Sequence, residues 1–259
     1  MKRQYNWLVH SFLGLTFFLG EFTSQAASRE RMEYDITWIG VSVGTLTVQN
    51  ESRDTGEVVR SIRIWNRPWI AKLYPVDNTI ECHIETTSEG PCHTITKKMG
   101  EKNFRQDDTL TLWPNAGHAV WSNAVSNVVH SFNVPVGSMD FVSFFFDLRD
   151  AARNEPTKAR GDYQLVMDQS VHALEIQIGA SEKLRTPHGP MDSIPVRAIS
   201  KSPMLFSRNQ PRVVWVAASQ PVVIYADVQT RFGAVRATLV KWEIDGKSLI
   251  GKPSTPTAD

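Results

Sequence analysis

The stretch YDITWIGVSVGTLTV at residues 34–48 decides the fold class that the sequence predicts. Apolar and polar residues alternate before Gly40, and the alternation resumes after Gly44. Alternation with a period of two is typical of a β-strand with one face against a core and the other in water. Because the two glycines interrupt the pattern, we interpret the stretch as a hairpin or a bent strand.

Similar strand patterns recur along most of the chain. Runs rich in β-branched and aromatic residues are separated by turn sequences such as Ser88-Glu89-Gly90-Pro91 and Pro187-His188-Gly189-Pro190. A parallel sheet would need a helix between strands, so short strands at this spacing favour an antiparallel sheet. We predict a mainly β fold, an antiparallel β-barrel, half-barrel or sandwich, with strands at 59–64, 79–86, 92–98, 108–113, 117–122, 163–167, 171–178, 191–200, 213–217, 222–228 and 234–243.

One segment departs from the strand pattern and predicts an amphipathic helix packed on the sheet. Ser138 or Asp140 can cap its first turn, and Arg149 and Arg153 suit its last turns. We expect the helix to cover one face or opening of the sheet with an apolar stripe at helical spacing, made of Phe141, Phe144, Phe145 and Leu148.

Composition and charge exclude several classes of protein. The chain has 259 residues, of which 41% are hydrophobic, so it can bury a substantial core. Its 28 basic and 27 acidic residues leave a net charge of +1, which argues against a nucleic-acid-binding surface. We therefore expect a globular protein whose partners are not nucleic acids.

The N-terminus has the features of an export signal. Lys2 and Arg3 precede an apolar run at residues 12–19, and Ser24-Gln25-Ala26 fits a cleavage site. We predict a cleavable signal peptide at 1–26 and a periplasmic or secreted protein, with a retained N-terminal anchor as the alternative. No cysteine lies near the cleavage site, so lipidation there is not expected.

The remaining chain is predicted to form one domain with no membrane span. Residues 27–248 are interpreted as a single β-rich domain, or as two halves that meet near residues 150–162. Residues 249–259, which contain two prolines and two threonines, are interpreted as a disordered tail.

Cys82 and Cys92 flank a predicted turn, so they are candidates for a disulfide across a hairpin, with free thiols as the alternative. His83 and His93 follow the two cysteines and suggest zinc. Adjacent strand residues point to opposite faces, so one site cannot easily collect all four side chains. We therefore predict neither a metal site nor a cofactor.

Gly40-Val41-Ser42-Val43-Gly44 matches the pattern G-x-S-x-G of serine hydrolases. That motif requires a strand that turns sharply into a helix, whereas here a strand pattern continues. We therefore interpret the glycines as structural. The alternative is a hydrolase in which Ser42 lies within reach of a histidine, namely His118, His130, His172 or His188.

Two groups of residues are candidates for ligand binding. Trp65, Trp69 and Trp121 could form an aromatic ligand surface. On or beside the predicted helix, the polar residues Asp140, Ser143 and Arg149 form the second group, for which a helix cap and surface charge pairs are the alternative interpretation.

Three segments together resemble the exported bacterial family called domain of unknown function 3108. The opening Tyr34-Asp35-Ile36-Thr37-Trp38-Ile39-Gly40 resembles its first strand. Val134-Pro135-Val136-Gly137-Ser138-Met139-Asp140, followed by Ser143 and Asp147-Leu148-Arg149, resembles its central signature. Phe232-Gly233-Ala234-Val235-Arg236-Ala237-Thr238-Leu239 resembles its last strand. The resemblance implies an exported, β-rich, barrel-like fold and brings no established activity.

These observations lead to a functional hypothesis with two alternatives. We expect a periplasmic, barrel-like binding module for an apolar or envelope-derived ligand, such as a lipid-like molecule or a polysaccharide, without covalent chemistry of its own. The first alternative is a cell-envelope assembly protein that docks another protein. The second is the serine hydrolase that uses Ser42.

Overall fold

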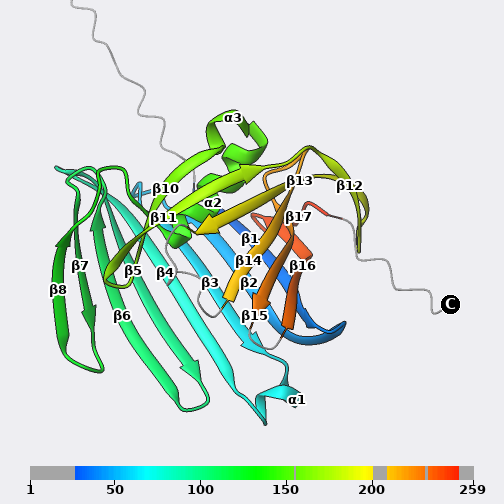
Figure 1. The fold of residues 1–259 in the computed structure, drawn as a ribbon, viewed down its shortest axis with the longest axis horizontal. Helices are drawn as coiled ribbons and strands as arrows, with labels where there is room; N and C mark the ends of the chain where they lie inside the picture. Colours follow the sequence, from blue (N-terminus) through cyan, green and yellow to red (C-terminus); the bar gives the residue numbers. More distant parts are fainter. Residues whose placement is uncertain (1–26, 155, 201–208, 231–232, 251–259) are drawn as a thin grey trace, which may run out of the picture.

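A computed structural model describes residues 27–154, 156–200, 209–230 and 233–250. The predicted signal peptide and residues 251–259 of the predicted tail lie outside these ranges. The strands of the described residues form one sheet (Figure 1). They are β1 (Ser28–Trp38), β2 (Val41–Ser52), β3 (Val58–Asn66), β4 (Val76–Thr87), β5 (Gly90–Glu101), β6 (Phe104–Trp113), β7 (His118–Asn123), β8 (Val128–Asn133), β9 (Met139–Asp140), β10 (Gly161–Met167), β11 (Ser170–Ile178), β12 (Glu182–Thr186), β13 (Gly189–Ser200), β14 (Asn209–Ala217), β15 (Val223–Thr230), β16 (Gly233–Ile244) and β17 (Lys247–Ser248). The helices are α1 (Pro68–Ala71), α2 (Phe141–Asn154) and α3 (Pro156–Ala159).

The sheet is an antiparallel meander that curls back on itself. Strands β1 to β7 each pair with the next strand, ending with the β7–β8 pair, and β1 also pairs with β16. From β16 the sheet continues through β15, β14, β13, β11 and β10 to β9, whose pairing with β10 is parallel. Within the described residues β8 pairs only with β7 and β9 only with β10, so the sheet does not close. The mainly β, barrel-like architecture that the sequence predicts is confirmed.

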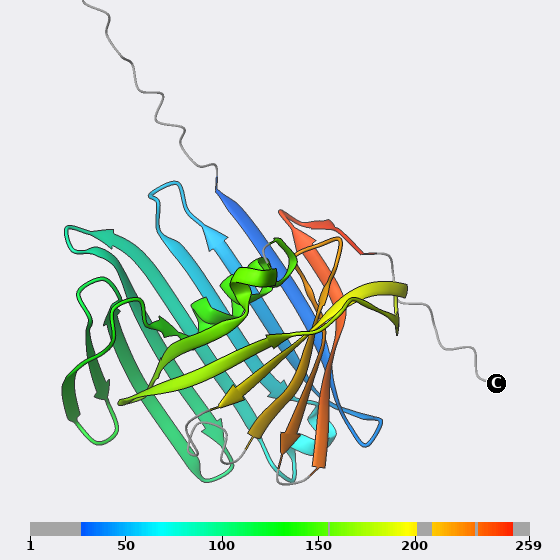
Figure 2. The ribbon, with the colours of Figure 1, turned by 45° about the horizontal axis from the view of Figure 1, so that its top comes forward.

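Helix α2 lies on the concave side of this curled sheet. Figure 2 shows strands β1–β8 as one wall, with helix α2 and strands β10 and β11 in front of it. The core lies in this concavity and includes Met32 and Tyr34 from β1, Leu239 and Trp242 from β16, and Phe146 from α2. Across the described ranges, no helix combines the length and apolar character that a membrane span needs.

The glycines of residues 40–44 have structural roles. Ile39 and Gly40 have φ values of +49° and +75° and form a two-residue turn, because Trp38 pairs directly with Val41. A Cβ atom on Gly44 would lie 2.8 Å from the backbone oxygen of Trp65 on the neighbouring strand β3. The first glycine permits the turn and the second permits close strand contact, as the structural interpretation of the motif expects.

The predicted helix is present, but its buried face differs from the predicted stripe. Phe141 is 39% exposed and Phe145 is only half-buried, whereas Phe146 is 1% exposed. The predicted stripe requires that a single face of the helix packs on the sheet. In the structure, strands on several sides of the concavity contact α2. The buried residues of α2 are Val142, Ser143, Phe144, Phe146, Arg149 and Ala152.

Phe146 is predicted to be a major contributor to stability. Its ring lies between two guanidinium groups, with Cζ of Arg60 at 4.9 Å and Cζ of Arg149 at 5.0 Å from the ring centre. We expect Phe146→Ala to reduce the free energy of unfolding by about 3–5 kcal/mol, because it opens a cavity in the core. Phe141 is exposed on the same helix and provides the matched control. We expect Phe141→Ala to change the free energy of unfolding by less than about 1 kcal/mol in the same denaturant titration.

Candidate functional site

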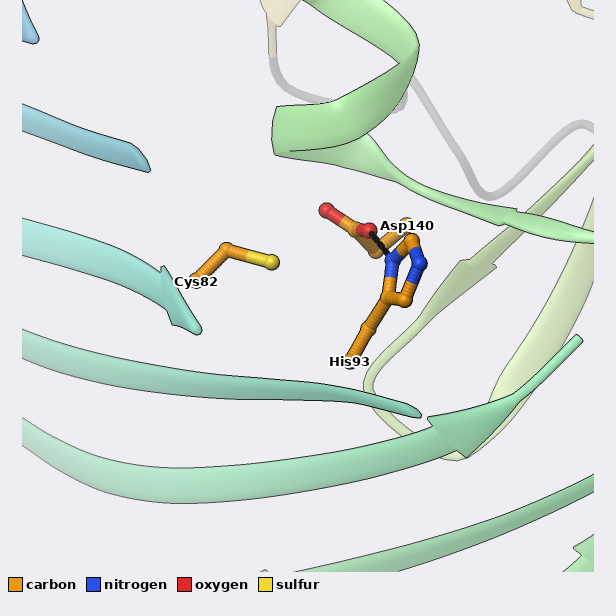
Figure 3. Close-up of side chains that lie close together, drawn as sticks. All are labelled: Cys82, His93 and Asp140. Atoms are coloured by element: carbon orange, nitrogen blue, oxygen red, sulfur yellow. Dashed lines mark hydrogen bonds and ion pairs between the residues drawn. The ribbon is translucent and has the colours of Figure 1, made fainter. Parts of the chain in front are cut away.

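A buried polar cluster lies where α2 begins. It comprises Cys82 on β4, His93 on β5, Asp140 on β9 and Ser143 on α2. Because Cys82 pairs with Ile95, and His93 lies two residues before Ile95, both side chains emerge on the same face of the sheet. Figure 3 shows Cys82 and His93 reaching from neighbouring strands toward the Asp140 carboxylate.

Asp140 uses its two carboxylate oxygens differently. Oδ1 accepts hydrogen bonds from the backbone N–H groups of Val142 and Ser143, both at 2.9 Å, and so caps the helix as the sequence predicts. Oδ2 lies 2.7 Å from Nδ1 of His93. Burial by itself raises the pKa of Asp140, but the hydrogen bond and charge of His93, with the hydrogen bonds of Ser143, outweigh it and hold the pKa below its ordinary value.

The Cys82 thiol is not activated as a nucleophile. Burial and the negative charge of Asp140 both raise the pKa of Cys82 well above the ordinary value of a thiol. A reactive cysteine requires the opposite, a lowered pKa that produces thiolate near neutral pH. Cys82 therefore contributes a protonated thiol to the cluster.

The cluster also does not form a serine triad. In such a triad one imidazole nitrogen contacts the serine and the other contacts the carboxylate. Here Ser143 Oγ lies 3.3 Å from Nδ1 of His93, the same nitrogen that contacts Asp140. The polar atoms converge on one point instead: one ligand atom each from Cys82, His93 and Asp140 lie within 4.8 Å of one another. This convergence makes them candidates to hold a metal ion.

A polar row continues from the cluster beneath α2. Cys82 pairs with Arg60, Arg60 with Asn50, and Asn50 with Glu30, so these residues lie side by side on neighbouring strands. The helix follows this row, since Asp147 Oδ1 lies 3.6 Å from Nη1 of Arg60.

The row ends in a buried ion pair. Arg149 Nη1 donates to both carboxylate oxygens of Glu30 at 3.0 Å, and the indole of Trp242 donates to the same carboxylate at 2.8 Å. Burial by itself lowers the pKa of Arg149, but the charges and hydrogen bonds of Glu30 and Asp150 together outweigh it and raise that pKa. Arg149, a candidate ligand residue in the sequence, therefore holds α2 against β1.

The predicted disulfide is not formed, because both cysteines are free thiols. Cys82 pairs with Ile95 and Cys92 with Glu85, so the two cysteines are three positions out of register. An odd offset places their side chains on opposite faces of the sheet. The same register separates the two Cys-His pairs, and Cys82 and His93 share the concave face.

The tryptophan candidates do not come together. Trp65 lies on the outer face of β3 beside Arg63, and Trp69 is 52% exposed on α1. Trp121 is 7% exposed on β7, where it pairs with Leu110 on the concave side. Of the six predicted ligand residues, the structure gathers Asp140 and Ser143 in one cluster and places Arg149 further along the same helix.

Ser42 lies outside any catalytic arrangement. It donates to Asp35 at 2.5 Å and accepts from Nε of Arg67 at 3.1 Å. None of the hydrogen bonds of the described residues joins it to a histidine, and strand β2 continues past it without a helix. The geometry gives no support to a hydrolase based on Ser42.

Two surface hollows lie elsewhere. One of about 440 Å³ lies over β3–β6, and its lining includes Arg63 and Asp77, which form a two-point ion pair at 3.0 Å. A second of about 540 Å³ is lined by residues of β10 and β11. Neither contains a residue of the buried cluster.

Together these features define a class of protein, an open β-barrel-like module with a helix held in its concavity. The family described as "Protein of unknown function (DUF3108)" matches residues 33–240, so the chain belongs to this family, as its motifs predict. A similar fold occurs in the crystal structure of a beta-barrel-like protein of domain of unknown function DUF1849 from Brucella abortus, with a TM-score of 0.55 and 10% identity over 83% of this chain and 97% of that chain. No curated protein matches the chain.

Breaking the buried ion pair from one side is expected to be costly. Arg149→Met leaves the Glu30 carboxylate buried without its counter-charge, so the free energy of unfolding should fall by about 3–5 kcal/mol. The double variant Glu30→Gln with Arg149→Met should recover part of this loss.

The matched control is Arg153→Met, since Arg153 lies exposed on the same helix. It should change stability by about 0.5 kcal/mol or less in the same urea titration. Equal losses for Arg149→Met and Arg153→Met would contradict a stabilising role for the buried pair.

Proposed function

We propose that this protein is an exported module that binds an amphiphilic molecule of the cell envelope on its concave face, without covalent chemistry of its own. The observation that carries the proposal is a curled sheet that stays open and leaves apolar side chains of its inner face partly uncovered. Open barrels of this kind offer concave apolar surfaces to small ligands. Export is supported by the N-terminal sequence, with its basic start, apolar run and Ser24-Gln25-Ala26.

The proposed apolar surface lies on β2, β3 and β4. Leu46 on β2 pairs with Ile64 on β3. Ile80 on β4 pairs with Ile62, two residues from Ile64, and therefore lies on the same face. All three side chains are half-buried and pack against the core. An apolar ligand that covered them would gain about 25 cal/mol for each Å² of apolar surface removed from water.

Trp121 supports a ligand that also carries an oxygen acceptor. Its indole N–H is buried and finds no acceptor among the residues that the structure describes. An unsatisfied buried donor costs about 1–3 kcal/mol, and a ligand carboxylate or carbonyl would remove that cost. An apolar chain with a polar oxygen, such as a fatty acid, combines both requirements.

Binding of palmitate to the purified chain tests the proposal. We expect saturable binding, measured by calorimetry, and a loss of about tenfold or more in affinity for Ile64→Glu, because a carboxylate would enter the apolar surface. Trp121→Phe should weaken binding severalfold, because it keeps the ring and removes the donor.

The control variant is Ser61→Glu, which lies on the outer face of the same strand and should bind like the wild type. Thermal melts of each variant separate loss of binding from loss of folding. Absence of palmitate binding by the wild-type chain, or equal effects of Ile64→Glu and Ser61→Glu, would contradict the proposal.

Docking of another envelope protein is a second candidate function, favoured by edge strand β8. This strand pairs only with β7 within the described ranges, is largely exposed and carries no Lys, Arg, Asp or Glu. Such an edge can accept an extended segment of a partner. If docking is the function, the wild-type chain should retain one stoichiometric protein from an envelope extract, and Val129→Lys should lose it. Lipid recovered without a protein partner would instead favour the first candidate.

A further inference from the structure

We propose that Cys82, His93 and Asp140 bind one divalent transition-metal ion of the zinc type beneath the N-terminus of α2. Thiolate, imidazole and carboxylate are the three side-chain donors that zinc accepts in proteins. The site goes beyond the amphiphile-binding function proposed above and does not depend on it.

The donors come from three strands that the fold holds together. Cys82 and His93 share the concave face of the β4–β5 hairpin, and Asp140 is brought over them by the β9–β10 pairing. Their ligand atoms already lie within 4.8 Å of one another. Zinc bond lengths of about 2.0–2.3 Å place tetrahedral ligand atoms about 3.3–3.8 Å apart, so adjustments of about 1 Å would complete the site.

The surroundings of Asp140 prepare it for this role. Its Oδ1 is held by the backbone N–H groups of Val142 and Ser143, which leaves Oδ2 directed at His93. Orientation of a ligating carboxylate by hydrogen bonds to its other oxygen is a usual feature of metal sites. Ser143 Oγ lies 3.3 Å from His93 Nδ1 and marks where a hydroxyl or a water would complete four ligands.

Charge also favours the ion in this buried place. A thiolate and a carboxylate together neutralise a divalent cation, so the occupied site carries no net charge into the interior. On binding, Cys82 loses its thiol proton to solvent as the sulfur–metal bond forms. The His93–Asp140 hydrogen bond breaks, and a ring nitrogen of His93 and Oδ2 of Asp140 bind the metal ion instead. Binding therefore releases at least one proton per metal ion, the proton of the Cys82 thiol.

Titration of the full chain, without a histidine tag, with Co²⁺ tests the proposal. We expect one Co²⁺ per chain, a sulfur-to-cobalt charge-transfer absorption in the near ultraviolet, visible bands typical of tetrahedral cobalt, and loss of both when Zn²⁺ is added. Zn²⁺ binding should release at least one proton near neutral pH, measured by calorimetry in buffers of different ionisation enthalpy.

The two cysteines provide a matched pair of variants. Cys82→Ser should abolish the sulfur absorption, whereas Cys92→Ser, on the opposite face, should retain it. Asp140→Asn keeps an oxygen that can cap α2 and should weaken metal binding by about tenfold or more. A wild-type chain without the sulfur absorption overturns the proposal, and so does an absorption that persists in Cys82→Ser.

Discussion

Charged contacts at both ends of α2 hold the helix inside the curled sheet, and the rest of the structure depends on this anchoring. At its start Asp140 caps the helix and binds His93, and in its third turn Arg149 binds Glu30. A buried charge costs several kcal/mol unless a partner of opposite charge compensates it. Only a position that satisfies Asp140 and Arg149 together avoids that cost, so the helix is fixed against β5 and β1.

The polar row and the apolar core have different roles in this arrangement. Apolar burial supplies most of the driving force but is non-directional, so it tolerates several positions of a helix in a concavity. Directional bonds to Glu30 and His93 select one of these positions. Phe146 takes part in both, because its ring is buried and also lies between the guanidinium groups of Arg60 and Arg149.

Most strands could be predicted from residue alternation, and the exceptions have local reasons. Strand β8, with the sequence VVHSFN, lies exposed at the sheet edge, so it does not need one strictly apolar face. Strand β12, with the sequence EKLRT, is short and carries three charges. Neither strand could be predicted, because alternation of apolar and polar residues indicates only strands that bury one face. These two strands are stabilised instead by pairing with a neighbouring strand.

The candidate site was predictable only in part. The residues Asp140 and Ser143 stand out in the sequence because they open a helix and share a face. The predicted disulfide requires that Cys82 and Cys92 pair directly across the hairpin. The turn instead pairs Thr87 with Gly90, which puts the two cysteines three positions out of register, so that Cys82 faces inward and Cys92 outward.

The sequence by itself determined the β-rich class of this protein, its family and the helix that interrupts its strands. These follow from local periodicity and short motifs, which the chain carries without reference to distant residues. Tertiary structure alone decided that Cys82, His93 and Asp140 meet, and that Glu30 pairs with Arg149. The physical reason is that Asp140 lies 47 positions from His93 and Arg149 lies 119 positions from Glu30, so only the curling of the sheet brings these pairs within bonding distance.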